Sequence, residues 1–292
     1  MKNIYIIGSI NTDLVISTPY IPKAGETLAG SGFFTARGGK GANQAVAAAR
    51  LGGNVIMCGC VGNDDFGTAA IKALETVGID VKNVRKIDGV PTGTAVIIVE
   101  NGDNRIILDK GANMCLTEKD IDVALENAQK GDIYLTQLES PIEIIGYSLK
   151  QAKEKGMFVI LNPAPANVEI EPYLRYCDLI APNESELELL GGKEKLLEKV
   201  DVLIVTLGGE GFEITTKDKT QKYPCIKVQV LDTTAAGDTL CGGLVVKMAE
   251  GKSLEEAANF GSKAASIACT RKGAQPSIPT KNEIDEYNVV GK

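Results

Sequence analysis

Short apolar runs recur along the chain, and stretches with helical periodicity separate most of them. The runs lie at residues 4–7, 54–60, 133–136, 158–161, 179–180 and 202–206. We interpret each run as a strand, and residues 42–51 and 67–76 as the first helices. Strands that alternate with helices favour a mainly parallel sheet covered on both faces. The pattern therefore predicts an α/β fold, a three-layer α/β/α domain over residues 1–292.

Helix-capping signals add detail to this pattern. Thr117, with Asp120 three residues on, predicts the start of a helix. The last third of the chain ends with two predicted helices, at about 236–249 and 253–269. The second begins at Ser253, where Glu256 is placed to complete a capping box.

Two segments, at about 12–36 and 91–109, do not follow the strand–helix rhythm. Both are rich in Gly, Thr and β-branched residues. Asn101-Gly102-Asp103 within the second segment predicts a β-hairpin. We interpret the two segments as insertions that form a small separate sheet, and this sheet as a lid that excludes water from a reaction.

Composition narrows the class of protein. Hydrophobic residues make up 44% and charged residues 24% of the chain, as in ordinary globular proteins. The net charge of −7 argues against a non-specific nucleic-acid binder. The first apolar run is too short for a signal peptide, and no run reaches about 18 apolar residues, so we expect no membrane span. Seven cysteines without a Cys-x-x-Cys pair predict reduced thiols in a cytoplasmic protein.

The chain contains no histidine. This absence excludes the Ser-His-Asp triad and every histidine-containing metal site. Any acid–base catalysis must therefore depend mainly on carboxylates.

The most informative segment, residues 231–239, reads Leu-Asp-Thr-Thr-Ala-Ala-Gly-Asp-Thr. Ala235, Ala236 and Gly237 are too small to cover their own backbone, so the N–H groups of a helix starting here would face open space and bind an anion. Asp238 lies in the same turn and can accept a proton. An anion site beside a base suits phosphoryl transfer to an alcohol.

A glycine-rich run, Gly-Gly-Lys-Gly-Ala-Asn at residues 38–43, precedes a predicted helix. Its glycines allow close approach to a ligand, and Lys40 and Asn43 supply polar groups. The run is not a Walker A loop, because Phe34 and Gly41 stand where that motif needs Gly and Ser or Thr, and the chain has no Gly-x-Gly-x-x-Gly. The alternative interpretation is a simple glycine-rich helix start.

Polar groups also follow two predicted strands. Asn11 and Asp13 come after the first strand, where α/β proteins bind ligands, and Asp13 can accept two hydrogen bonds from a vicinal diol. The alternative is a turn with Asx capping. Glu139 follows the strand at 133–136 and lines the same cleft, unless it is an exposed loop carboxylate.

Three later motifs have both a structural and a functional interpretation. Asn183 and Glu186 form a helix cap, or lie near phosphates and orient water around Mg²⁺. The run from Thr206 to Gly211 is a tight turn or packs against a nucleotide. The polar segment 270–277, rich in exposed carbonyl groups, could form a ring around a monovalent cation together with Asp232.

Together these motifs resemble those of the PfkB-type family of carbohydrate kinases, over nearly the whole chain. The Ala-Ala-Gly-Asp element at 235–238 is typical of the family. The runs at 38–49 and 270–277 are similar to those of members that phosphorylate ribose. Further similar segments lie at 8–13, 162–166 and 182–184.

The resemblance implies a role for each candidate residue. Asp238 would be the general base, and Ala235, Ala236 and Gly237 the anion hole. The acceptor sugar would contact Asn11, Asp13, Gly39, Lys40, Asn43, Glu139 and Asp238. ATP would contact Asn183, Thr206, Gly208, Gly209, Gly211, Gly237 and Ser262, and Glu186 would bind Mg²⁺ through water. An activating K⁺ would be held by Asp232, Thr234, Ala268, Arg271, Gly273 and Ser277, several of them through backbone carbonyls.

The resemblance also implies the reaction and the assembly. The expected reaction phosphorylates D-ribose at its 5-hydroxyl with ATP, and the expected partner is a second copy of the chain, joined through the lid. Fructose, deoxyribose or adenosine is the alternative acceptor, a non-catalytic sugar-binding sensor is a more remote alternative, and a dehydrogenase lacks its glycine fingerprint. Ser262 occupies the position where family members often have a histidine near adenine, which leaves nucleotide preference open.

Overall fold

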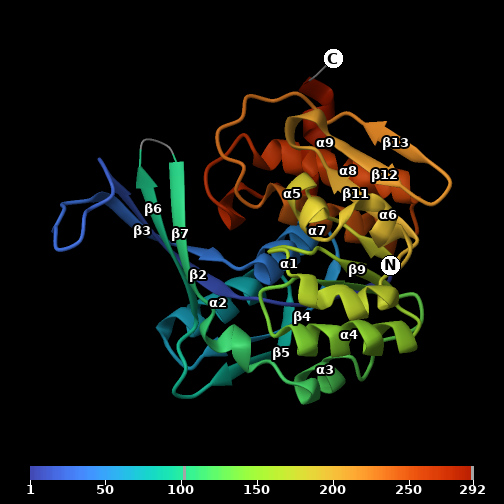
Figure 1. The fold of residues 1–292 in the computed structure, drawn as a ribbon, viewed down its shortest axis with the longest axis horizontal. Coiled ribbons are helices and arrows are strands. Elements are labelled where there is room, and N and C mark those ends of the chain that lie inside the picture. The colour runs from blue at the N-terminus through green and yellow to red at the C-terminus, as the bar shows by residue number, and fades with distance from the viewer. Residues whose placement is uncertain (101–102, 291–292) are drawn as a thin grey trace.

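A nine-stranded sheet forms the centre of the molecule (Figure 1). The computed structural model describes residues 1–100 and 103–290, and side chains to residue 287. The strands lie in the order β13-β12-β11-β10-β9-β8-β1-β4-β5. In that order they span Thr220–Tyr223, Phe212–Thr215, Val202–Thr206, Leu179–Ile180, Phe158–Leu161, Ile133–Thr136, Asn3–Ile7, Asn54–Gly62 and Asp80–Ile87. Neighbours from β11 to β5 are parallel, and β12 and β13 add an antiparallel edge.

Helices cover both faces of this sheet because its strands are apolar on both sides. Ile4 and Ile6 of β1 belong to one buried cluster, and Tyr5 and Ile7 to the other. The first cluster packs against α1 (Lys40–Arg50), α2 (Asp65–Thr76), α7 (Ala236–Ala249), α8 (Leu254–Ala268) and α9 (Lys281–Val290). The second packs against α3 (Glu118–Ala124), α4 (Ile142–Glu154), α5 (Glu184–Leu189) and α6 (Gly192–Leu197). The predicted three-layer α/β/α architecture is confirmed.

A second, four-stranded sheet projects from this body (Figure 1). It comprises β3 (Ser31–Gly38), β2 (Asn11–Thr18), β6 (Gly93–Glu100) and β7 (Asp103–Asp109), in that order. The outer pairs are antiparallel and the central pair, β2 with β6, is parallel. The two predicted segments thus form one small sheet, while turn residues 101–102 of the predicted hairpin lie outside the described residues.

Most predicted elements agree with the structure, but the strands β5, β12 and β13 were not predicted. β12 is buried, yet its apolar residues alternate with polar ones and form no apolar run. Four short strands, β8, β9, β10 and β11, have the predicted bounds. The prediction that the chain ends with two helices was wrong, because α9 follows α8. Among the described side chains of α9, Ile284 is the one that belongs to the core, and the flanking residues 281–283 and 285–286 are polar, so no apolar run reveals the helix. Among the described residues, no helix is both long and apolar enough to cross a membrane.

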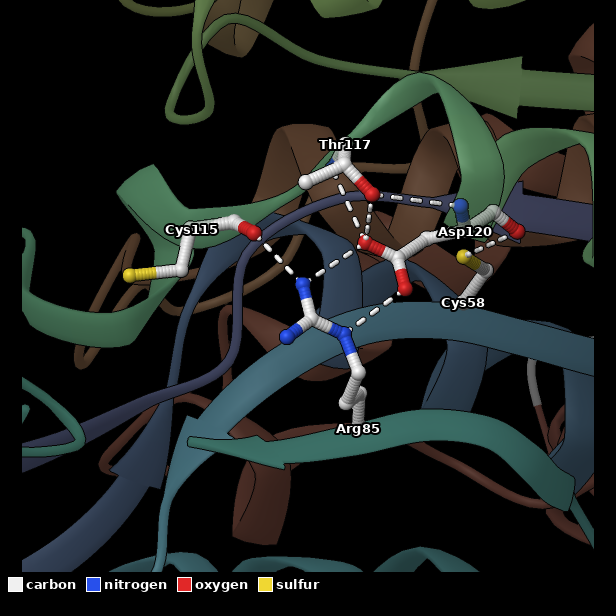
Figure 2. A network of polar contacts seen from close by, with 5 residues as sticks. All are labelled: Cys58, Arg85, Cys115, Thr117 and Asp120. Atoms are coloured by element: carbon white, nitrogen blue, oxygen red, sulfur yellow. Dashed lines mark hydrogen bonds and ion pairs between the residues drawn. The ribbon is translucent and has the colours of Figure 1, made fainter. Parts of the chain in front are cut away.

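The predicted cap at Thr117 also ties α3 to the sheet. Thr117 and Asp120 form a complete capping box. Arg85 of β5 donates hydrogen bonds from Nε and Nη2 to the two carboxylate oxygens of Asp120, over 2.7 and 2.8 Å (Figure 2). Its Nη2 also donates to the carbonyl oxygen of Cys115. This two-pronged ion pair fixes the helix start against the last strand of the sheet.

Candidate active site

The start of α7 has the features expected of an anion site. Ala235, the residue before the helix, has φ 59°, and no other described residue except glycine has a positive φ. This conformation costs an alanine about 1–2 kcal/mol. The carbonyl oxygen of Ala235 accepts hydrogen bonds from N and Oγ1 of Thr239, which anchor the turn. The start of this long helix, at Ala235, Ala236 and Gly237, lines a cavity, although the backbone N of Ala236 itself donates to the carbonyl oxygen of Thr233.

Two cavities meet at this helix start and share Thr206, Thr233, Ala236 and Gly237. The first is polar. It is lined by Lys40, Asn162, Ala164, Ala181, Asn183, Glu186, Ala235, Asp238 and Cys241 in addition to the shared residues. The second has a largely apolar wall, which includes Ile226, Val228, Val230, Leu240 and Ala265. The pair can accept a molecule with an anionic group at the helix start and a flat apolar group beyond it.

Asp238 lies on the wall of the polar cavity and is only 7% exposed. Its Oδ2 accepts a hydrogen bond from Nδ2 of Asn43, and its Oδ1 accepts one from Nε2 of Gln44, each over 3.0 Å. Burial raises the pKa of this carboxyl, while the charge of Lys40 and the two amide donors oppose the rise. Asp238 is therefore a held carboxylate with a raised affinity for a proton, as a general base requires.

Lys40 carries positive charge into the same cavity from the first turn of α1. Burial lowers its pKa, but the nearby carboxylates of Asp238, Glu139 and Glu186 outweigh burial, so the net pKa is raised. Oε2 of Glu139 accepts hydrogen bonds from Oγ of Ser9 and from the backbone N of Lys40. Glu139 is thus a fixed member of the site.

Asp13 and Asn11 reach the site from the first strand of the small sheet. The carboxylate of Asp13 fills the space left by Gly38, where a Cβ atom would lie 2.4 Å from Oδ2. Burial, reinforced by the charge of Glu139, raises the pKa of Asp13 to about 6. Oδ1 of Asn11 accepts a hydrogen bond from Nδ2 of Asn113. The structure therefore brings these two residues together with Glu139 and the start of α1.

Gly39 allows the two elements to approach. Its φ is 88°, and a Cβ atom there would lie 2.7 Å from the backbone N of Asn11. Only glycine satisfies both conditions. The glycine-rich run thus does more than start a helix, because Gly39, next to Lys40, packs directly against the backbone of Asn11.

The cap at Asn183 and Glu186 exists and faces the polar cavity, so the two interpretations of this motif are compatible. Oδ1 of Asn183 accepts from the backbone N of Glu186, and Oε2 of Glu186 accepts from the backbone N of Asn183. Asn183 also forms a β-bridge with Thr206. The cap therefore holds both side chains on the wall of the polar cavity.

The glycine turn after β11 and the middle of α8 form walls of the second cavity. Gly208, Gly209 and Gly211 line it on one side, and Ser262 lies on α8. Gly208 and Gly211 have positive φ values of 54° and 108°. The space beside Gly208 and Gly209 is open, since no atom lies within 4 Å of a Cβ atom built at either position.

The predicted cation loop is partly assembled through Asp232. Its Oδ1 accepts hydrogen bonds from N and Oγ1 of Thr234, and its Oδ2 accepts from the backbone N of Gly273. Arg271 directs its guanidinium group to Glu283, so only its carbonyl group can face a cation. Ala268 and Ser277 are buried on the same segment. Within the described residues, no cluster of three or more Asp, Glu, Cys or His side chains could hold a metal ion.

Several polar residues at the site were not predicted. Gln44, Gln137 and Asn162 surround Asp238 or the residue that holds it, and Asn113 fixes Asn11. The sequence carries one signal for Gln44: it is a polar residue inside an alanine-rich helix. Asn162 opens the segment 162–166, which contributes to the resemblance but was given no role, and Gln137 and Asn113 lie in segments without a spacing pattern that points to the site.

Comparison with known proteins identifies relatives along the whole chain. The family model for pfkB family carbohydrate kinases matches residues 1–281. A ribokinase from Haemophilus influenzae is 41% identical over 300 residues, covering 98% of both chains. A deoxyribokinase from Salmonella typhi is 37% identical over 300 residues, again covering 98% of both. The structure of Arabidopsis thaliana ribokinase complexed with ribose and ATP matches with a TM-score of 0.86 and 33% identity, covering 98% of each chain.

Proposed function

The chain belongs to the pfkB family of carbohydrate kinases, and we propose that it is a ribokinase, which converts D-ribose and ATP into D-ribose 5-phosphate and ADP. One observation carries the proposal. The buried carboxylate of Asp238 and the start of α7 share the wall where the polar cavity meets the apolar one. This arrangement places a base and an anion site next to each other, as transfer of a phosphoryl group to an alcohol requires.

Asp238 is the general base in this reaction. It takes the proton from the 5-hydroxyl as the oxygen forms its bond to the γ-phosphorus, while the bond from that phosphorus to the bridging oxygen of ADP breaks. The helix start formed by Ala235, Ala236 and Gly237 stabilises the negative charge of the transferring group. Lys40, which lines the same cavity, adds a positive charge.

The acceptor sugar binds among the polar groups that surround Asp238. Oδ1 of Asn43 is buried and has no hydrogen-bond partner among the described residues, so a sugar hydroxyl can donate to it. Asp13 and Glu139 accept hydrogen bonds from further hydroxyls, and Asn11, Gly39 and Lys40 complete the site. Contacts of this kind favour a small polyol.

ATP lies across both cavities. Its phosphates bind near Asn183 and the start of α7, and its adenosine part binds in the apolar cavity between the glycine turn and α8. That cavity includes Thr206, Gly208, Gly209, Gly211 and Ser262. The apolar wall supplies stacking area for a purine ring.

Two metal ions would assist. Glu186 lines the polar cavity and would hold Mg²⁺ through water, and this ion would neutralise charge on the phosphates. A K⁺ ion would be held by Asp232, Thr234, Ala268, Arg271, Gly273 and Ser277. The link from Asp232 to Gly273 supports this assignment, because it joins the anion-hole loop to the carbonyl-rich segment. Oxygen donors of this kind suit a hard cation.

The small sheet is the lid, and a homodimer forms through it. Apolar side chains on its strands are exposed, notably Ile106 at 61% and Ile107 at 66%. A partner lid would cover such residues. We place the protein in the cytoplasm, since its seven free cysteines suit a reducing compartment.

The test is ADP release from ATP and Mg²⁺ with ribose, 2-deoxyribose, fructose or adenosine, each in K⁺ and in Na⁺. Turnover that is fastest on ribose and greater in K⁺ supports the substrate and the cation ring together. Turnover only on another acceptor would leave the family assignment intact and show that ribose is not the substrate. Binding of ribose without turnover on any acceptor would make the protein a sugar-binding sensor.

A further inference from the structure

A buried amide network holds the side of Asp238 opposite to Asn43. Gln44 is fully buried and belongs to α1. Its Nε2 donates hydrogen bonds to Oδ1 of Asp238 over 3.0 Å and to Oδ1 of Asn162 over 3.1 Å. Its Oε1 accepts one from Nε2 of Gln137 over 2.6 Å. All polar groups of Gln44 are therefore engaged inside the protein.

The neighbours of Gln44 determine which end of its amide faces Asp238. Nδ2 of Asn162 donates to the carbonyl oxygen of Ala181, so Oδ1 of Asn162 is left to accept from Gln44. Gln137 supplies a donor to Oε1 of Gln44. A reversed amide would place oxygen against oxygen at both Asp238 and Asn162. The network thus presents only a donor to Asp238.

We propose that Gln44 is a positioning residue for the general base: Gln137 and Asn162 orient its amide, and its Nε2 fixes Oδ1 of Asp238 as a hydrogen-bond acceptor. This inference rests on the proposed function and extends it to residues outside the substrate contacts. Asn43 holds Oδ2 in the same way, so both oxygens accept a bond and the carboxylate plane is fixed towards the acceptor hydroxyl.

The groups around Asp238 act on its pKa in opposite directions. Burial raises the pKa of Asp238, and the charge of Glu139 adds to this rise. Lys40 and the donors on Asn43 and Gln44 lower the pKa. Cys241, on α7, has its own thiol pKa raised by burial and by Asp238 and Glu186, and so stays neutral. Removal of the Gln44 donor takes away one interaction that lowers the pKa of Asp238. The carboxyl then stays protonated to higher pH.

The experiment measures kcat and KM for ribose from pH 5 to 9 in wild type, Gln44→Leu and Gln137→Leu. In Gln44→Leu we expect kcat at neutral pH to fall by about tenfold to a hundredfold, while KM changes by less than about threefold. We also expect the acid limb, the range in which kcat falls as pH is lowered, to move to higher pH. Gln137→Leu should give a smaller change in the same direction, because it removes only the group that orients Gln44.

Tyr134→Phe is the matched control for lost stability. It removes a buried hydrogen bond, between Oη of Tyr134 and Oγ of Ser148, in the core on the other face of the sheet. We expect it to lower Tm without moving the acid limb. If Gln44→Leu does not fold, Gln44→Glu keeps the size and places a second carboxylate against Asp238, which must raise the acid limb further.

A direct readout separates this proposal from the assigned reaction. In protein labelled with ¹³C at aspartate carboxyls, the Asp238 signal, assigned through Asp238→Asn, should titrate at higher pH in Gln44→Leu than in wild type, whether or not ribose is the substrate. An unchanged titration and an unchanged acid limb in folded variants would overturn the positioning role. Absence of turnover on ribose in wild type would overturn the proposed function alone.

Discussion

Nδ2 of Asn43 donates a hydrogen bond to Oδ2 of Asp238 over 3.0 Å, across 195 positions of sequence. The bond joins the glycine-rich start of α1 to the first turn of α7. The other end of the same amide, Oδ1, is buried without a partner among the described residues. Asn43 therefore holds Asp238 with one atom and leaves the other unpartnered. In the proposed function this second atom accepts a bond from the sugar, which would couple sugar binding to the position of the base.

This double role predicts a kinetic difference between neighbours in α1. Replacing Asn43 by Ala removes a contact with the sugar and a bond to the base, so we expect KM for ribose to rise and kcat to fall, each by about tenfold or more. Gln44→Leu should reduce kcat alone. Steady-state kinetics of the two variants decide the matter, and an unchanged KM in Asn43→Ala would contradict the sugar contact.

Asp13 predicts how ribose binding responds to pH. Its pKa of about 6 means that the free protein carries a neutral carboxyl below that pH, which accepts sugar hydroxyls less well. We expect the Kd for ribose to rise as pH falls from 7.5 to 5. In Asp13→Asn this dependence should flatten and the Kd at pH 7.5 should be higher, as measured by calorimetric titration across the range.

The same pKa has a consequence for stability. The folded pKa lies above the ordinary value of 3.8, so ionisation of Asp13 lowers the free energy of unfolding as pH rises from 3.8 to about 6. Asp13→Asn should therefore be more stable than wild type at pH 7.5 in urea unfolding without sugar. Equal or lower stability of the variant there would contradict the cost that burial imposes on this carboxylate.

Two glycines of α7 predict opposite outcomes for the same substitution. A Cβ atom at Gly237 meets no atom within 4 Å, whereas one at Gly242 would lie 2.4 Å from Cβ of Ala47. Gly237→Ala should leave Tm unchanged or higher and reduce kcat/KM for ATP by about tenfold or more, because its methyl group enters the space of the phosphoryl group. Gly242→Ala should lose about 1–3 kcal/mol of stability. Full activity in folded Gly237→Ala would contradict the anion hole.

The exposed residues of the small sheet predict the assembly. Ile106 pairs with Ile97 and Ile107 with Val96, so the two exposed isoleucines point to opposite faces of the sheet. We expect the double variant Ile106→Asp, Ile107→Asp to shift a dimer to monomer in sedimentation. Val123→Asp is the control, because Val123 is an apolar residue on α3, outside the lid, with 54% of its surface exposed. A monomeric wild type, or a variant that remains dimeric, would contradict dimerisation through the lid.

Much of the fold could be predicted because short apolar strands and capped helices leave local signals. The bounds of β8 to β11, the start of α7 at Ala236 and the capping box at Ser253 all agree with the structure. β13 is exposed and polar at three of its four residues, so apolar runs did not reveal it. The short polar helix α9 was missed for a similar reason.

The residues of the site also fall into two groups, those that sequence motifs predicted and those that only the structure revealed. Asp238, Lys40, Asn43 and Glu139 were predicted from motifs. The fold places Lys40 and Asp238 in one cavity, bonds Asn43 to Asp238 and sets Glu139 close enough to influence Lys40 by its charge. Gln44, Gln137 and Asn162 lie up to 118 positions apart, and hydrogen bonds between them exist only once three separate elements have packed together. No local pattern encodes such a contact, so only the structure identifies what holds the base.

The most direct test of the account concerns Asp238→Asn. The measurement is kcat with ribose, ATP, Mg²⁺ and K⁺, together with ribose affinity by calorimetry on the same preparation. If Asp238 is the general base, kcat falls by about 10²–10⁴ or more while ribose affinity stays near that of wild type. A folded Asp238→Asn variant that turns over ribose at a near-normal rate would contradict the account.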